Sequence, residues 1–493
     1  MWSDKLFLGV DVGTTSVKAG LVDAGGNGLC QVSREYPSFY PSEGWAEQRA
    51  EDWWNAAAAA VRQLTAARPD LASRICCVCV SSQAPTLFGI DRQGNPVGNA
   101  MIWMDRRAQG ICERELALHK AYIEAYSGNR LDPYYVLPKL LWQKENDPKT
   151  YRKVDQYLQI NGWLVYRLTG RRTIDQTHAA LTQMVNIYQM DWEEKAFGLF
   201  GLEMEKWPRI CGCGEIVGEV LPAVAEAWGL PPSVLVVAGC IDGAAVPLGL
   251  GLRTAGDIFE MSGQSSGIGV LQAEPKFHPN LCSLKHALSG QWILKGSMSC
   301  SGGALKWFRD QVDRAGDYQE YDRLADSSVP GARGVTFLPY LNGERAPLWD
   351  TSLRGIYFGI STATGRADLV RAIMEGTGYA LRTILEEFGT ELEKKPILGT
   401  GGGYRSPVWT QIKADILNRE ICVYEMGFDA AVRGDAFLCM QALGLPIPWP
   451  ERDAGSVCRP KAENRAVYDV GYELFQKIYR ANRELFPLRL RGE

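Results

Sequence analysis

The chain has 493 residues, of which 46% are apolar and 22% are charged, and its formal net charge is −4. A chain of this length exceeds what one hydrophobic core usually supports, so two domains are expected. The slightly acidic balance argues against nonspecific binding of nucleic acid, because that binding requires a basic surface. The proportions are ordinary for a soluble globular protein.

The start of the chain and its longest apolar run bear on where the protein resides. Asp4 and Lys5 interrupt the start and no cleavable apolar region follows, so we expect no signal peptide. Residues 234–252 contain Asp242 and several glycines, which is typical of a buried strand, turn and helix rather than a membrane span. The thirteen cysteines are scattered, as expected for reduced thiols, and a cytoplasmic location follows.

Residues 6–22 predict a β-hairpin with a phosphate-binding turn. The turn residues are Gly13, Thr14, Thr15 and Ser16. Backbone N–H groups in such a turn form a nest for an anion, and Lys18 adds a positive charge. Asp11 would repel a bare phosphate, so its carboxylate fits the site only with Mg²⁺ between the two groups. The alternative interpretation is an ordinary hairpin with a polar turn.

Two strand ends make up a candidate substrate side. Residues 75–80 predict a buried strand, and the polar loop after it contains Gln83, at a position where ligands gather in α/β folds. Residues 100–107 predict a strand that runs into a group of polar and aromatic side chains, which includes Trp103, Asp105 and Arg106. In a polyol site the indole would pack on a sugar face, the carboxylate would accept hydroxyl protons and an arginine would donate. The alternative is a solvated strand end.

Helical patterns separate the strands along the whole chain, and this alternation is typical of an α/β protein. The expected helices span residues 45–67, 107–128, 137–146, 156–169, 220–228, 305–312, 367–387, 406–418, 434–444 and 464–483.

Asp242 follows a buried strand at residues 234–239 and precedes a helix of small residues. An Asp-Gly pair is most often a simple turn. The location of this pair between a buried strand and a helix favours a functional role for Asp242. Residues 256–271 then repeat the opening pattern of strand, Gly/Ser turn and strand, about 250 residues after the first copy. The second turn contains Gly263, Gln264 and Ser265. Such self-similarity indicates duplicated domains, whose two phosphate hairpins would clamp one nucleotide.

A third glycine-rich turn ends the strand predicted at residues 396–403. Glycine lets the backbone lie against a flat ring, so this turn is a candidate adenine site, although a simple strand-to-helix turn is equally compatible. No long linker interrupts the chain, so the two halves are expected to abut, with boundaries at 1–245 and 246–493.

The constellation resembles the FGGY carbohydrate kinases, of the actin/hexokinase/Hsp70 ATPase-domain superfamily, over nearly the whole chain. Residues 11–18 resemble the first phosphate motif, residues 355–375 the family signature, and residues 401–415 the adenosine motif in its xylulokinase form. The resemblance implies two duplicated ribonuclease H-like (actin-like ATPase) domains with a central cleft. It also implies ATP and Mg²⁺ as cofactors and a small sugar or polyol as substrate.

The resemblance assigns roles by position. Asp242 matches the catalytic base, and Asp11 matches the carboxylate near Mg²⁺, which it would contact through water. The positions around the nucleotide phosphates are Gly13, Thr14, Thr15, Ser16, Lys18, Gly263, Gln264 and Ser265. Gln264 stands where the family usually has threonine, so the hydroxyl contact at this position is open. The adenosine-side positions are Gly302, Gly402, Gly403 and Ser406.

The substrate side departs from the family pattern. Trp103 and Asp105 match xylulokinases, but residues 84–86 are Ala-Pro-Thr where xylulokinases usually carry Met-His-Gly, so a sugar-contacting histidine is missing. Residues 343–347 occur in both xylulokinase-like and gluconokinase-like members. We therefore expect phosphorylation of a terminal hydroxyl of a small ketose or polyol. Xylulose is the first candidate, and gluconate, ribulose or a tetritol are alternatives.

A different class of function is a non-catalytic ATP-binding protein, either a sugar sensor or an actin-like filament former. Intact Asp11 and Asp242 argue against a sensor, and the sugar-side strand ending at Asp105 argues against a filament. Domain closure around the substrate is expected, with a hinge near residues 239–251. No nucleic-acid or membrane partner is expected, and a homodimer, common in the family, stays open.

Overall fold

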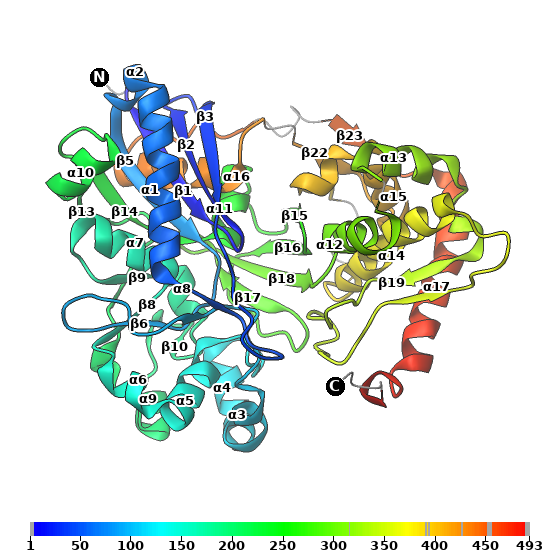
Figure 1. Ribbon diagram of the computed structural model, residues 1–493, viewed down its shortest axis with the longest axis horizontal. Helices are drawn as coiled ribbons and strands as arrows, with labels where there is room; N and C mark the ends of the chain where they lie inside the picture. The colour runs from blue at the N-terminus through cyan, green and yellow to red at the C-terminus, as the bar shows by residue number, and fades with distance from the viewer. Residues whose placement is uncertain are drawn as a thin grey trace.

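The computed structural model describes residues 4–314, 316–389, 392, 395–424, 427–450 and 456–488. Two large β-sheets form its frame, one built mainly from each half of the chain, with helices packed around both (Figure 1). This arrangement confirms the predicted α/β class with two sheet-containing units. Among the described residues, no helix has the length and apolar character needed to cross a membrane.

The first sheet has the strand order β13-β14-β5-β1-β2-β3. Its strands are β1 (Leu6–Val12), β2 (Ser16–Asp23), β3 (Gly28–Glu35), β5 (Ile75–Ser82), β13 (Ile216–Glu219) and β14 (Leu235–Ile241). Strand β1 pairs antiparallel with β2, in the predicted hairpin, and parallel with β5 on its other side. All seven residues of β1 are buried, because the strand lies in the middle of the sheet with both faces covered.

The second sheet has the order β17-β18-β16-β15-β21-β22-β23. Its strands are β15 (Ile258–Ser262), β16 (Ser266–Gln272), β17 (Cys282–Lys285), β18 (Trp292–Met298), β21 (Ile397–Thr400), β22 (Ile421–Val423) and β23 (Ser456–Cys458). The antiparallel run β15-β16-β18 is continued by β21 and β22, both parallel to β15. The first sheet has the same plan in β1-β2-β3, β5 and β14. The two hairpins predicted as copies therefore occupy equivalent places.

The helices and short strands complete the two units. The helices of the first half are α1 (Ala50–Ala67), α2 (Pro69–Ala72), α3 (Gln109–Arg114), α4 (Lys120–Ser127), α5 (Val136–Asn146), α6 (Pro148–Lys153), α7 (Ile160–Thr169), α8 (Gln176–Ala180), α9 (Glu194–Phe200), α10 (Pro222–Trp228) and α11 (Asp242–Gly249). Those of the second half are α12 (Gly302–Trp307), α13 (Tyr318–Ser327), α14 (Arg366–Glu386), α15 (Pro407–Leu417), α16 (Ala430–Ala442) and α17 (Arg465–Asn482). The short strands are β4 (Glu47–Gln48), β6 (Phe88–Ile90), β7 (Ala100–Met101), β8 (Gln156–Leu158), β9 (Thr173–Asp175), β10 (Val185–Asn186), β11 (Asp191–Trp192), β12 (Arg209–Cys211), β19 (Thr336–Leu338) and β20 (Ile356–Phe358).

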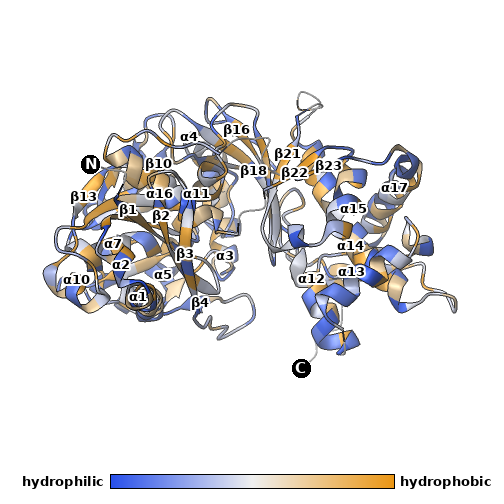
Figure 2. Ribbon diagram, turned by 90° about the horizontal axis from the view of Figure 1, so that it is seen from above, coloured by the Kyte–Doolittle hydropathy of each residue, from blue (hydrophilic) through white to orange (hydrophobic). Residues whose placement is uncertain are grey.

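Helix α16 belongs to the second half of the sequence but packs against the first sheet (Figure 1). A Cβ built on Gly9 of β1 would lie 2.4 Å from the backbone oxygen of Val432. A buried apolar cluster joins Phe7, Leu248 and Phe437 to Phe259 and to other side chains of the second sheet. In Figure 2, strands of both sheets carry orange, hydrophobic residues, as expected for strands that contribute to a shared core. The two halves therefore have a common core between them.

Several expected boundaries are wrong, because a strand partner or a capping side chain decides where the element begins or ends. The helix expected at 156–169 begins only at Ile160, because Gln156–Leu158 pair with β6 as strand β8. The helix expected at 434–444 begins four residues earlier, because the Asp429 side chain accepts the N–H of Ala431 at 2.9 Å and caps it. The strand expected at 100–107 is limited to Ala100–Met101, where it pairs with β4.

Other expected helices start or continue differently. Residues 107–128 form α3, a short 3-10 turn (Leu116–His119) and α4 rather than one helix. The helix expected from residue 45 starts at Ala50, after the short strand β4. The helix expected at 305–312 starts at Gly302 and continues into a π-helical turn over Phe308–Asp313.

Candidate active site

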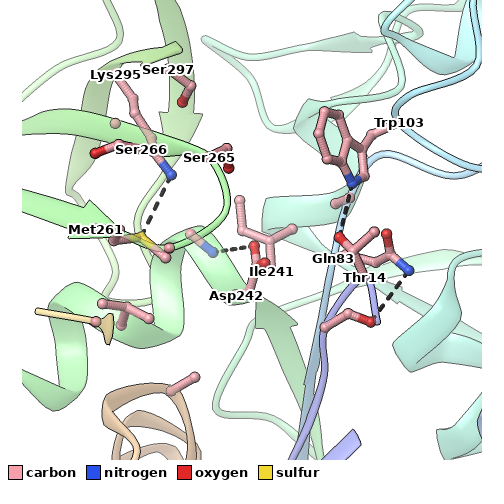
Figure 3. Close-up of a pocket in the computed structure, with 18 of the residues that line it drawn as sticks. Thr14, Gln83, Trp103, Ile241, Asp242, Met261, Ser265, Ser266, Lys295 and Ser297 are labelled. Carbon is pink, nitrogen blue, oxygen red and sulfur yellow. Dashed lines mark hydrogen bonds between the residues drawn. The ribbon is translucent and has the colours of Figure 1, made fainter. Parts of the chain in front are cut away.

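A cavity of about 390 Å³ lies where the two hairpins face each other, and both halves of the chain line it (Figure 3). The predicted site residues on its wall are Asp11, Gly13, Thr14, Lys18, Gln83, Trp103, Asp242, Gly263, Ser265 and Gly402. Thr15 and Ser16 belong to the same turn but do not line the cavity. Residues from distant parts of the sequence thus meet at one place.

Neighbouring polar groups hold the first turn in position. Its backbone closes through the N–H of Gly13, which donates to Ser16 O at 3.0 Å. The Gln48 side chain donates to Thr14 O at 2.8 Å, and the Trp103 indole N–H donates to Thr14 Oγ1 at 3.1 Å. Because contacts within the protein hold its backbone and the Thr14 hydroxyl, the turn is preorganised before any ligand arrives. The indole also ties the substrate-side loop to the phosphate turn.

Charges of both signs surround this turn. Lys18 Nζ lies 2.7 Å from an Asp429 oxygen and 3.7 Å from an Asp11 oxygen. Asp11 is only 4% exposed, and burial raises the pKa of its carboxyl to about 7 although Lys18 lowers it. Ser81 donates to the fully buried Asp435 at 3.0 Å, and burial raises the pKa of that carboxyl as well. Two carboxylates, Asp11 and Asp429, thus share Lys18, and Ser81 connects the third acid, Asp435, to Asp11, so a bound cation would be favourable here.

The donor set limits how such a cation is held. Within the described part of the chain, no group of three or more His, Cys, Asp or Glu side chains is arranged to hold a metal ion. Asp11 is a hard oxygen donor that faces the cavity beside the turn, which fits Mg²⁺. A Mg²⁺ ion there would need water and phosphate oxygens for its other positions, as it commonly does in nucleotide sites.

Asp242 is the first residue of α11, directly after the buried strand β14. Its Oδ1 accepts the N–H of Gly243 at 2.5 Å (Figure 3). Burial raises the pKa of the Asp242 carboxyl, and the charge of Lys295 lowers it. The preceding residue is fixed as well, because Ile241 N–H donates to Thr177 Oγ1 at 2.8 Å. The carboxylate therefore has a defined position on the cavity wall.

A Ser–His–Asp series supports this end of β14. His178 lies 3.0 Å from Ser82 Oγ through Nε2 and 2.6 Å from Asp175 Oδ2 through Nδ1. All three side chains are buried and none lines the cavity, so the serine cannot act on a ligand there. Asp175 also accepts the N–H of Thr177 at 2.9 Å. The series links the ends of β5 and β14 and thereby positions Asp242.

The second turn packs its backbone against the start of α12. The N–H groups of Gly302 and Gly303 donate to Gly263 O and Gln264 O at 3.0 and 2.9 Å. A Cβ on Gly302 would lie 2.6 Å from Gly263 O, so only glycine permits this approach. Gln264 is not on the wall of the central cavity but on that of an adjacent one.

This adjacent cavity, of about 790 Å³, contains all four positions assigned to adenosine. Its walls include Gln264, Gly302, Gly402, Gly403 and Ser406, together with Tyr318, Asp322 and Trp409. Gly263 and Gly402 line both cavities, so a ligand could extend from one into the other. The Ser406 hydroxyl donates to Asp322 at 2.6 Å and accepts the N–H of Trp409 at 3.0 Å, which caps α15.

Two residues expected to contact the substrate do not line the central cavity. Asp105 is fully buried, and its carboxylate accepts the N–H of Ala46 and the guanidinium of Arg107, both at 2.7 Å. Arg106 pairs with Asp132. The reason for the difference is that the expected strand turns after Met101, so these side chains support the loop that carries Trp103.

Three charged residues on the wall were not predicted as site residues: Asp429, Lys295 and Arg345. An aspartate before an apolar helix is an N-cap pattern, so Asp429 could have been found from the sequence. Arg345 lies within residues 343–347, a stretch considered only for its family resemblance. Lys295 has no such signal, because a lysine in an alternating strand is usually a solvated side chain.

The chain matches models of known protein domains over most of its length. Residues 6–249 match the N-terminal domain of the FGGY family of carbohydrate kinases, and residues 261–443 match its C-terminal domain. The fold is the actin-like ATPase fold, and the matched domains are those of ATP-dependent sugar phosphotransferases, as expected. The chain belongs to the FGGY family of carbohydrate kinases.

Relatives of two substrate types are similar to the chain. The gluconokinase of Bacillus subtilis (strain 168) is 29% identical over 454 residues, which cover 89% of this chain and 87% of that protein. The xylulose kinase of the same strain is 28% identical over 491 residues, 98% of each chain. The solved structure of ligand-bound xylulose kinase from Lactobacillus acidophilus has a TM-score of 0.89 at 25% identity, covering 97% of this chain and 98% of that one. The sugar kinase activity is thereby established, without a specific sugar.

Proposed function

We propose that the protein transfers the γ-phosphoryl group of ATP to a terminal hydroxyl of a small ketose or polyol, with Asp242 as the general base. The observation that carries this proposal is the position of Asp242 in the cavity between the two phosphate hairpins. The acceptor would lie beside Gln83 and Trp103, and the adenosine would occupy the adjacent cavity.

In the proposed reaction, the acceptor hydroxyl oxygen forms a bond to the γ-phosphorus while the bond to the β,γ-bridging oxygen breaks. The hydroxyl proton goes to the Asp242 carboxylate, which must be ionised to accept it. The N–H groups of the two turns bind the triphosphate oxygens and stabilise the charge that develops on them. Bound Mg²⁺, held by Asp11 through water, would supply further neutralisation of the phosphate charge.

Xylulose is the first candidate acceptor. Trp103 lines the cavity, as the xylulokinase pattern implies, and full-length xylulose kinases are among the relatives. Ala84 lines the cavity next to Gln83, in the segment that lacks the usual histidine. A ketose would therefore be held there by the amide of Gln83 and by Trp103, without an imidazole.

Gluconate is a second candidate, and Arg345 favours it. The Arg345 guanidinium lies 4.6 Å from the centre of the Trp103 ring, on the substrate side of the cavity. Its Nη2 donates to Met298 O at 3.0 Å, and its Nε has no hydrogen-bond partner among the described residues. A sugar carboxylate would accept from this group, which a neutral ketose does less well.

An ADP-release assay with ATP, Mg²⁺ and a panel of acceptors tests the proposal. The panel contains D- and L-xylulose, D- and L-ribulose, gluconate, glycerol, erythritol and L-fuculose. We expect a strong response to one of them, and Asp242→Asn should lower kcat by about 100- to 10,000-fold with ATP binding unchanged.

The control for that variant is Asp191→Asn, an exposed carboxylate that does not line the cavity, which should have normal activity. Near-normal turnover of Asp242→Asn would disprove the assignment of the base. Binding of ATP without a response to any acceptor would reject these sugars as substrates.

A further inference from the structure

Lys295 is a half-buried cation on the cavity wall that has no part in the reaction as described so far. It lies in β18, opposite Gly269 of β16, and its side chain extends along the second hairpin toward Asp242 (Figure 3). Its Nζ lies 3.6 Å from Met261 Sδ and 3.6 Å from the point where a Cβ on Gly243 would be. The ammonium group is thus next to the residue that follows the proposed base.

The ammonium group has no anionic partner in the protein at short range. No carboxylate oxygen of the described residues lies within 4.0 Å of Lys295 Nζ. The other lysine on the wall, Lys18, is by contrast 2.7 Å from Asp429. A partly buried charge without a partner is costly, and this cost falls when an anionic ligand group arrives. The nearest place for such a group is the space between Lys295, Asp242 and the second turn.

We propose that Lys295 is a catalytic residue, whose ammonium group donates a hydrogen bond to a non-bridging oxygen of the phosphoryl group during transfer. This inference rests on the proposed function, because it places the γ-phosphoryl group at Asp242. Ser265, Ser266 and Lys295 line the same side of the cavity (Figure 3). Lys18 and the first turn lie on the other half of the chain. The migrating group would thus have a cationic contact from each half.

No proton moves to or from Lys295 in this step. The oxygen–phosphorus bond to the acceptor forms, the bond to the ADP oxygen breaks, and the hydroxyl proton goes to Asp242. The lysine stays protonated and offsets the negative charge shared among the phosphoryl oxygens. Its contribution should therefore be found in kcat rather than in the binding of either substrate.

A second effect of the same charge is on the ionisation of Asp242. Burial raises the pKa of the Asp242 carboxyl, and Lys295 is the first of the charges that lower it. The other titratable groups that face Asp242 are His178, Lys18, Asp11, Tyr36 and Tyr134. Removing the ammonium group should raise the pKa of Asp242 further. As the pH is lowered, the variant would therefore lose activity at a higher pH than the wild type does.

The test compares Lys295→Met with Lys295→Arg and with the control Lys276→Met, an exposed lysine in the loop between β16 and β17. With the acceptor that the wild type phosphorylates, kcat should be about 100-fold lower in Lys295→Met than in the wild type. The KM for ATP and the KM for the acceptor should both stay within about threefold of the wild-type values. The acid limb of the kcat/KM profile should move to higher pH. Lys295→Arg should return the acid limb to its wild-type pH and recover much of kcat. Lys276→Met should behave as wild type.

Binding of ADP with aluminium fluoride, a mimic of the phosphoryl group in transfer, provides a readout that needs no turnover. Aluminium fluoride should tighten ADP binding to the wild type and to Lys295→Arg, and this tightening should be lost in Lys295→Met. A wild type inactive on every acceptor would contradict the proposed substrates, and this binding comparison would still decide the role of Lys295.

The inference is overturned if Lys295→Met keeps kcat and the acid limb unchanged. It is equally overturned if the acceptor KM rises tenfold at normal kcat, because the lysine would then bind an anionic group of the acceptor. Should Lys295→Met fail to fold by circular dichroism, Lys295→Gln replaces it, with the same expected results.

Discussion

Three adjacent glycines after β21 have separate roles. Gly401 has a φ of +99°, and a Cβ there would lie 2.4 Å from Ser262 O, so the position admits only glycine. A Cβ on Gly403 would lie 2.2 Å from Ser262 Oγ, which also accepts from Lys413 at 2.8 Å. A Cβ on Gly402 would meet nothing within 4 Å. Gly402 is therefore free of packing constraints in the protein itself.

This contrast allows a test of the adenosine site. Gly402→Ala should leave the melting temperature unchanged but weaken ATP binding tenfold or more, because the methyl group would occupy space that the nucleotide needs. Gly403→Ala should instead destabilise the fold by about 1–3 kcal/mol, since Ser262 must move. Calorimetry gives the ATP affinity, and thermal unfolding gives the stability. Unchanged affinity in Gly402→Ala would mean that the nucleotide binds elsewhere.

Single residues also show what the sequence could predict about the site. The turn glycines, Lys18 and Asp242 were predictable, because local patterns of strand, turn and helix place them at element ends. Asp105 and Lys295 were not. Whether a carboxylate faces a cavity or a buried arginine depends on how the chain turns after Met101. Whether a strand lysine faces solvent or a cavity depends on the opposite half of the molecule.

At the scale of elements, the crossing of α11 and α16 determines how the site is assembled. Cβ atoms on Gly249 and Gly434 would lie 1.9 Å from Ala430 O and 2.0 Å from Ala245 O. The two helix backbones are thus in direct contact. Because α11 begins with Asp242 and α16 follows its cap Asp429, this contact sets the distance between two charged groups of the cavity.

Gly434→Ala should therefore affect both stability and activity. The added methyl group must push the helices apart, which should cost about 1–3 kcal/mol or more and lower kcat by displacing Asp242. Thermal unfolding and the kinase assay measure the two effects.

The control for that variant is Gly198→Ala in α9, where a Cβ would meet nothing within 4 Å. It should be as stable as wild type or slightly more so, because alanine favours helix. A Gly434→Ala protein with normal stability and kcat would show that the helix contact is not required.

The elements themselves were predicted better than their ends. The two hairpins and the long helices α1, α14 and α17 follow from periodicity and propensity over many residues. Errors occurred where a strand distant in sequence decides the secondary structure of a segment. Gln156–Leu158 are a strand only because β6 lies beside them, and the strand expected at 100–107 is limited to the two residues that pair with β4.

At the scale of the whole molecule, the two hairpins come from different sheets and face one cavity, so ligand binding should draw them together. Closure would exclude water from the transferable phosphoryl group. Small-angle scattering should give a smaller radius of gyration with a non-hydrolysable ATP analogue and acceptor together than with either alone. Asp242→Asn should close equally, since its binding contacts remain. An unchanged radius with both ligands would contradict closure.

The position of α16 has a consequence for the gene that encodes the chain. Residues 1–245 alone would leave the faces of β1 and β5 that α16 covers open to water, although they include every strand of the first sheet. A gene truncated there would yield an insoluble product, and the missing segment would have to be supplied from downstream codons. The two halves, although built on one plan, cannot be recombined independently with halves of other genes, because each exchange must preserve the fit of this helix.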